Sequence, residues 1–224
     1  MRRFLRGNGL GLGFGVLFLA ALAGQALSGN ADFNAQQLAD GGEPIGMAAY
    51  LTSSAFAVDV AENWQSEYLQ FLLYIVATVW LVQRGSPESK PLDKVGRESD
   101  EEQKVGRYAT PESPRWARLG GWRTALYSRS LALAMGGLFL MSWGAQSIAG
   151  WANYNSRQLA DFTDPVGWLG YVGSPDFWNR SLQNWQSEFL AVGSMAVLSV
   201  YLRERGSPES KPVGEPHGVT GETG

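Results

Sequence analysis

Two short polar runs carry most of the side chains in this chain that could do chemistry. They are Asn63-Trp64-Gln65-Ser66-Glu67 and Asn184-Trp185-Gln186-Ser187-Glu188. On a helix, the amide, hydroxyl and carboxylate of each run fall at i, i+3 and i+4 and share one face. A carboxylate beside hydrogen-bonding groups can hold a proton or a cation, and a carboxylate pair can act as acid and base. The candidate polar site is therefore Asn63, Ser66, Glu67, Asn184, Ser187 and Glu188.

The depth of these residues in a membrane leaves two interpretations open. About 26 Å of helix separates Glu67 from Arg84, so Glu67 falls just inside the outer edge of a hydrocarbon core of roughly 30 Å. Trp64 and Trp185 fall at the outer interface, where aromatic side chains anchor helices. One interpretation is an anchor with hydrogen bonds between helices, and the other is an ion or ligand site. Two inward carboxylates in one layer would need a shared proton, a cation or a basic partner such as Arg180.

A second motif, Arg-Gly-Ser-Pro-Glu-Ser-Lys-Pro, occupies residues 84–91 and again 205–212. Arginine at a helix end, glycine just past it and proline soon after are typical of a helix stop. The two copies could also dock on each other, on lipid head groups or on a soluble partner. The residues singled out in this cytoplasmic motif are Arg84, Gly85, Pro87, Glu88, Lys90, Arg205, Gly206, Pro208, Glu209 and Lys211.

Both motifs belong to a longer repeat. Residues 10–91 align without a gap on residues 131–212, at a constant offset of 121. Each copy has an apolar first segment, at 10–27 and 126–148, and a second helix expected at about 53–84 and 174–205. A duplicated unit of this size predicts two similar halves. We therefore expect an all-α integral membrane protein of four transmembrane helices, arranged as a tandem repeat of two two-helix units.

The domain organisation follows from this repeat. Residues 1–91 form the first two-helix repeat, 92–125 a flexible cytoplasmic linker, 126–212 the second repeat and 213–224 a disordered tail. The first apolar segment resembles a signal peptide, but its counterpart in the middle of the chain indicates a retained helix. Within the linker, Trp116, Leu119 and Trp122 alternate with arginines, which predicts a short amphipathic helix on the membrane surface.

The charge distribution predicts the topology. Lys and Arg gather at 2–6, 84–129 and 203–211, whereas 29–62 contains neither and 150–183 contains only Arg157 and Arg180. The positive-inside rule therefore places both termini and the linker in the cytoplasm, with 29–62 and 150–183 outside.

Composition argues against several function classes. The chain has no Cys, a single His at 217 and a net charge of −3. Thiol chemistry, cysteine-based zinc sites and a basic nucleic-acid surface are therefore not expected. We expect no enzyme, no metal site and no cofactor, because there is no Ser/His/Asp set, metal-ligand cluster or phosphate loop.

The two motifs, in this order and around an apolar stretch, resemble those of an uncharacterised family of bacterial multi-pass membrane proteins. The resemblance covers residues 10–91 and 131–212. It implies a multi-pass protein of the bacterial cytoplasmic membrane and carries no activity or functional residue with it.

The leading expectation is a non-enzymatic structural or partner-binding protein that sits in the lipid bilayer and has a cytoplasmic or membrane protein partner. The alternative is a small transporter or channel with Glu67 and Glu188 at its outer mouth. The oligomeric state is left open.

Overall fold

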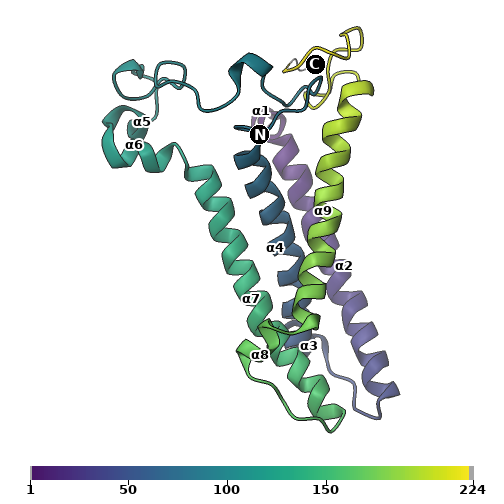
Figure 1. The fold of residues 1–224 in the computed structure, drawn as a ribbon. Helices are drawn as coiled ribbons and strands as arrows, with labels where there is room; N and C mark the ends of the chain where they lie inside the picture. The colour runs from purple at the N-terminus through teal and green to yellow at the C-terminus, as the bar shows by residue number, and fades with distance from the viewer. Residues whose placement is uncertain (1, 222–224) are drawn as a thin grey trace. The chain divides into compact units, whose positions relative to one another are not determined.

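The computed structural model describes residues 2–221. Within that part the regular structure is all helical, as expected, and no strand is present. The long helices are α2 (Gly9–Ala39), α4 (Ser54–Ala77), α7 (Ser130–Ala160) and α9 (Pro175–Tyr201) (Figure 1). The short ones are α1 (Arg2–Gly7), α3 (Met47–Leu51), α5 (Arg115–Leu119), α6 (Gly121–Tyr127) and α8 (Trp168–Val172), with 3-10 turns η1 (Leu92–Lys94) and η2 (Gly106–Tyr108).

The long helices differ in their capacity to cross a membrane. In the described part of the chain, α2 and α7 are long and apolar enough to span a bilayer, whereas α4 and α9 do not reach the same apolar content. The polar Asn-Trp-Gln-Ser-Glu runs lie inside α4 and α9 and shorten their apolar stretches. Two of the four expected spans therefore meet this criterion.

The starts of α4 and α9 lie where the sequence predicts them. The Ser53 hydroxyl accepts a hydrogen bond from the backbone N–H of Phe56 at 3.2 Å. Ser174 does the same for Phe177 at 3.4 Å, and Pro175 takes the first helical position of α9. These serines cap backbone donors that have no partner within the helix, which is why each helix begins one residue later.

The ends of α4 and α9 come earlier than predicted. The expected limits were Arg84 and Arg205, but α4 ends at Ala77 and α9 at Tyr201. Beyond these points, the backbone N–H groups of Gln83 and Glu204 donate to serine hydroxyls six residues ahead, at 3.0 Å in both copies. An N–H bonded forward to a side chain is not available for a helical bond to the preceding turn. The expectation was wrong because the motif folds its own loop.

The first helix of each repeat extends past its apolar segment and ends after Gln-Leu-Ala. α2 ends at Ala39 and α7 at Ala160. In the first copy, Gly42 N–H bonds to Gln37 C=O at 2.7 Å and Gly41 N–H bonds to Leu38 C=O at 3.2 Å, which is the Schellman pattern. The second copy repeats both bonds at Thr163 and Phe162.

The chain divides into two compact units that cut across the sequence repeat. One contains Met1–Val60 and Ala145–Val172, and the other contains Ala61–Gly144 and Gly173–Gly224. Each unit therefore takes equivalent segments from both repeats, while the predicted halves 1–91 and 126–212 are each divided between the units.

The first unit holds the loop after α2 and the loop after α7 with the same pair of contacts. The Asn34 side chain accepts from Ile45 N–H at 2.8 Å and donates to Ile45 C=O at 3.0 Å. Asn155 makes the same two bonds to Val166, at 2.9 and 3.0 Å. An asparagine that satisfies both backbone groups of one residue fixes the loop against its helix, and this clamp occurs once in each repeat.

A buried tyrosine follows each clamp. Tyr50 is 2% exposed and Tyr171 is 0% exposed. The Tyr50 hydroxyl lies where a Cβ at Gly29 would stand, and the Tyr171 hydroxyl lies in the same way against Gly150. Glycine in the long helix therefore gives the short helix its close approach.

The linker and the tail contain more structure than the sequence predicts. The linker holds η1, η2, α5 and α6, connected by turns. The predicted amphipathic segment is two short helices joined at Gly120 and Gly121, whose φ angles are 73° and 61°. The tail was expected to be disordered from Val213, but residues 213–221 run in turns and make hydrogen bonds. Residues 222–224 lie outside the described part.

Candidate functional site

The structure separates the predicted polar site into buried and exposed side chains. Ser66 is buried, whereas Asn63, Glu67 and Ser187 are exposed and Asn184 and Glu188 are half-buried. Ser66 and Ser187 hydroxyls donate to the backbone of their own helices, at the carbonyls of Asn63 and Asn184 (2.9 and 2.8 Å). The hydroxyls therefore satisfy helix carbonyls first and are not organised around a ligand.

One contact joins the two copies of this site. Ser66 Oγ lies 3.4 Å from Glu188 Oε1. Glu67 and Glu188 lie close enough for their charges to repel. One of the two carboxylates, Glu188, therefore lies against a buried serine, while Glu67 is exposed.

The two anchor tryptophans are not equivalent. Trp64 is 41% exposed, whereas Trp185 is half-buried and donates from Nε1 to Gln65 Oε1 at 2.7 Å. Trp185 packs with Trp143, whose ring centroid is 5.8 Å away. Trp143 has Leu22 as its counterpart in the first repeat, so this aromatic contact belongs to the second repeat alone.

Gln65 was not singled out from the sequence. Its side chain is fully buried, and its Nε2 atom has no hydrogen-bond partner. Its counterpart Gln186 is exposed. Gln65 accepts a hydrogen bond from Trp185, which packs on Trp143. The available sequence signal was that Trp143 has Leu22 as its counterpart in the first repeat.

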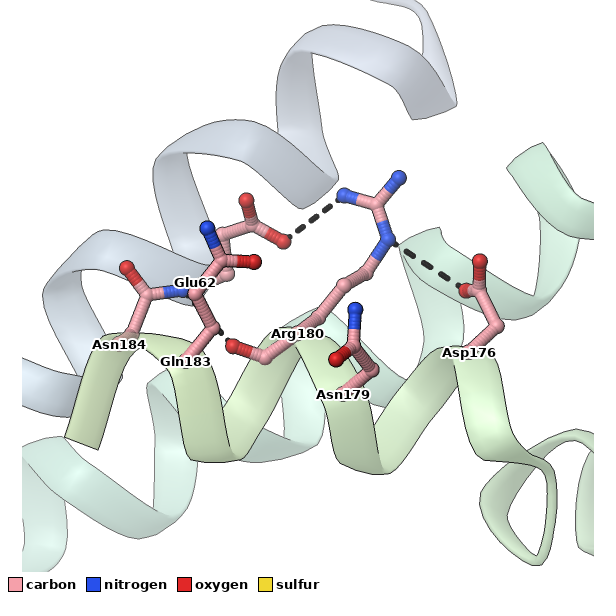
Figure 2. A pocket seen from close by; sticks show the side chains of 6 residues that line it. All are labelled: Glu62, Asp176, Asn179, Arg180, Gln183 and Asn184. Atoms are coloured by element: carbon pink, nitrogen blue, oxygen red, sulfur yellow. Dashed lines mark hydrogen bonds and ion pairs between the residues drawn. The ribbon is translucent and has the colours of Figure 1, made fainter. Parts of the chain in front are cut away.

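A polar pocket of about 320 Å³ lies next to these residues (Figure 2). It is lined by Glu62, Asp176, Asn179, Arg180, Gln183 and Asn184. Arg180 Nη1 lies 2.9 Å from Glu62 Oε2, and Arg180 Nε lies 3.4 Å from Asp176 Oδ2. Arg180, the basic partner suggested for Glu67 and Glu188, thus pairs with two other carboxylates. The scarcity of arginine on this side was the available signal, but it did not identify Glu62 or Asp176.

The Arg-Gly-Ser-Pro-Glu-Ser-Lys-Pro motif folds into the same loop twice. We call the two copies the first motif loop (residues 83–96) and the second motif loop (residues 204–219). Ser89 accepts from Gln83 N–H, and Ser210 accepts from Glu204 N–H. Gly85 and Gly206 both have left-handed backbones, with φ of 86° and 82°. These repeated bonds make each loop a folded element and not a plain helix stop.

The motif lysines hold the chain that follows them. Lys90 Nζ donates to Gly96 C=O at 2.9 Å and lies 2.6 Å from Glu98 Oε1. Lys211 is 1% exposed and donates to three tail carbonyls, those of Pro216, His217 and Val219 at 3.2, 2.8 and 3.2 Å. Burial, followed by the positive charge of Arg203, lowers the pKa of the Lys211 ammonium.

The two motif loops meet at equivalent glutamates. Glu88 and Glu209 are hydrogen-bonded through their side chains, which raises the pKa of the Glu209 carboxyl above its ordinary value. Tyr74, near the end of α4, donates its phenolic hydrogen to Glu88. This contact between Glu88 and Glu209 joins one repeat to the other.

The tail adds a second connection between the loops. Gly85 N–H donates to Thr220 Oγ1 at 2.8 Å, and Gly221 N–H donates to Ser86 C=O at 3.1 Å. His217 Nδ1 lies 3.1 Å from the Val200 carbonyl, at the end of α9. The sole histidine therefore contacts the protein's own backbone.

The described residues contain no group of three or more His, Asp or Glu side chains placed to hold a metal ion. Among curated proteins and solved structures, no match to this chain is found. One family matches over nearly the full length: the sequence model of a domain of unknown function, DUF6766, covers residues 1–222. The chain therefore belongs to the DUF6766 family.

Proposed function

We propose that the chain is a non-enzymatic, multi-pass protein of the bacterial cytoplasmic membrane with a structural or partner-binding role. In this arrangement α2, α4, α7 and α9 cross the membrane, and the motif loops, the linker and both termini lie in the cytoplasm. The apolar character of α2 and α7 and the Lys/Arg asymmetry support this orientation. The polar ends of α4 and α9 project from the outer side.

The observation that carries the proposal is the internal use of the repeated motif. Ser89, Ser210, Lys90 and Lys211 are all bonded to the protein's own backbone. A catalytic or transport site keeps polar groups available for a substrate. Here the most strictly repeated polar residues join and stabilise the cytoplasmic ends of the helices, which favours a structural role.

The topology can be tested by single cysteines, because the chain contains none of its own. Glu43→Cys and Phe162→Cys place one thiol in each outer loop at exposed positions, and Gln103→Cys places one in the linker. An impermeant maleimide should label the first two in intact cells or spheroplasts and spare the third until the membrane is opened. Labelling of position 103 alone would contradict the proposed orientation.

A small transporter or channel is the second candidate function, and the Ser66–Glu188 contact favours it. The purified protein in vesicles should pass Na⁺, K⁺ and H⁺ no faster than empty vesicles. A flux that the double variant Glu67→Gln/Glu188→Gln abolishes, and that a matched Glu112→Gln variant retains, would replace the structural role with transport.

The partner-binding half of the proposal is tested in native membranes. Crosslinking in the cell, followed by purification in mild detergent, should recover the chain bound in fixed stoichiometry to itself or to one membrane or cytoplasmic protein. Recovery of an isolated monomer, together with vesicle flux, would contradict the proposal.

A further inference from the structure

An unusual surface follows the linker. We call it the arginine–tryptophan segment, residues 115–129, which comprises α5, α6 and the two residues before α7. Its large apolar side chains are open to solvent, with Trp116 at 41%, Leu119 at 46%, Trp122 at 68%, Leu126 at 43% and Tyr127 at 42%. Only Ala117 in the segment is buried. A run of exposed aromatic and aliphatic side chains marks an interaction surface.

The segment is strongly basic. Arg115, Arg118, Arg123 and Arg129 are all exposed, and no acid occurs between Glu112 and Asp161. In the part of the chain that the structure describes, none of these four arginines has an ion pair; Arg123 instead lies over the Trp122 ring at 5.4 Å. Four guanidinium groups without a paired acid favour an anionic partner. The planar guanidinium group can donate two parallel hydrogen bonds to phosphate oxygens.

The segment is held in a defined shape. The Thr124 hydroxyl donates to the Trp116 carbonyl at 2.7 Å and so ties α6 back to α5. The rings of Trp116 and Trp122 meet edge to face at 6.3 Å. On the helices, Trp116 and Leu119 share one face, as do Trp122 and Leu126. The aromatic pair is thus presented by a fixed turn.

The sequence position identifies the occupant. The segment ends where α7 begins, and α7 is long and apolar enough to cross a membrane. A surface joined directly to the start of a span is held at the height of the lipid head groups. Aromatic rings lie favourably at this depth, while arginine side chains reach the phosphates.

We propose that the arginine–tryptophan segment is a docking surface for anionic phospholipids of the cytoplasmic leaflet. The tryptophans enter the head-group layer, and the four arginines bind lipid phosphates. This inference rests on the membrane topology proposed above and adds a lipid class to it. It makes the segment an anchor that fixes the start of α7 at the inner surface.

The test uses the full-length protein, one copy to a nanodisc, with a nitroxide on the single-cysteine variant Ala125→Cys. Position 125 is an exposed alanine in α6 and so reports on the segment without removing an arginine or a tryptophan. Nanodiscs contain either phosphatidylcholine alone or an equal mixture with phosphatidylglycerol. Two-component spectra and accessibility to oxygen give the ratio of docked to free segment.

The docked fraction should rise with phosphatidylglycerol and fall in about 1 M salt, where the screening length is roughly 3 Å. Arg118→Gln and Arg123→Gln should each lower the docking constant by roughly fivefold. Arg107→Gln, which removes one positive charge at another exposed linker position, should leave the docking constant unchanged. Equal docking in both lipids, or equal behaviour of all variants, would overturn the proposal.

A second label separates this inference from the topology. Met141 is 65% exposed within α7. If α7 spans the membrane, a nitroxide on Met141→Cys should lie in the hydrocarbon core, where dissolved molecular oxygen is concentrated, in every lipid mixture. A water-accessible label at 141 would refute the proposed span. A label at 125 that is free in every nanodisc but protected in native membranes would assign the surface to a protein, which also overturns the lipid assignment.

Discussion

Glu88 and Glu209 hold the same position in the two motif loops and are hydrogen-bonded to each other. A carboxyl–carboxyl bond needs one proton, and the pKa of Glu209 is accordingly raised above its ordinary value near 4.5. The duplication has thus placed two equivalent acids against each other. The contact joins the repeats only while that proton is bound.

The first prediction concerns the pH dependence of this pair. A folded-state pKa above the unfolded value stabilises the protein fully below pH 4.5, and that stability is lost as the pH rises through the folded pKa. Glu209→Gln can donate to Glu88 at every pH. The thermal midpoint of wild type in detergent should fall over this window, and that of Glu209→Gln should fall less. The difference should be small, because Glu209 is exposed and water screens its charge.

Glu112→Gln is the matched control, since it removes the same charge from an exposed linker position. It should keep the wild-type pH dependence. Identical profiles for wild type and Glu209→Gln would show that the shared proton does not contribute to stability.

Local chemistry explains which elements could be predicted. Ser53 and Ser174 cap helices through hydrogen bonds that reach three residues ahead, so their effect is visible in a short stretch of sequence. The end of α4 depends instead on the folded first motif loop, in which Ser89 takes the N–H of Gln83. That loop also uses Lys90, which bonds to the chain that follows it, whereas the helix-stop pattern alone placed the end at Arg84.

The candidate site was less predictable for a similar reason. Helical spacing predicts that Asn63, Ser66 and Glu67 lie on one side of α4. It cannot say how far the helix turns about its own axis, and that angle decides which side chains are buried. In the structure, the rotation of α4 about its axis buries Gln65 and Ser66 and leaves Glu67 exposed. The buried Gln65 accepts a hydrogen bond from Trp185, a residue far away in sequence, and helical spacing cannot predict that contact.

The second prediction compares the motif glycines. Gly85 and Gly206 both have positive φ, so alanine at either site should cost about 1–2 kcal/mol of unfolding free energy. A Cβ at Gly206 meets open space, whereas one at Gly85 would meet the His217 carbonyl and come within 2.9 Å of Val200 Cγ1. Gly85→Ala should therefore melt lower than Gly206→Ala and speed proteolysis of the tail. An equal loss of unfolding free energy in the two variants would contradict the close contact between the tail and Gly85.

The third prediction concerns Gly29 and Gly150, the helix glycines that face buried tyrosines. Alanine there would displace the Tyr50 or Tyr171 hydroxyl and should destabilise the protein by about 1–3 kcal/mol. Gly24→Ala, in the same helix as Gly29 but facing open space, should instead gain up to about 1 kcal/mol from helix propensity.

A double variant makes this comparison sharper. Tyr50→Phe removes the atom nearest to the added Cβ, so it should recover part of the loss in Gly29→Ala. Thermal melts of the two single variants and the double variant measure the coupling. Additive losses would contradict the close approach of Tyr50 to α2.

The last prediction concerns Phe162, a 99% exposed phenylalanine with a φ of 56°. The equivalent position in the first repeat is Gly41, with a φ of 79°, in the same helix-ending pattern. A left-handed backbone costs a residue with a Cβ about 1–2 kcal/mol relative to glycine. In detergent, Phe162→Gly should therefore raise the thermal midpoint by roughly 2–4 °C for each kcal/mol gained.

Two control variants test the same position. Gly41→Phe should lower the thermal midpoint by a similar amount, while Gly46→Phe, at an exposed position without positive φ, should change it little. A lower midpoint for Phe162→Gly in lipid nanodiscs, together with a higher one in detergent, would show that the exposed ring contacts lipid. A lower midpoint in both would contradict the strain at this position.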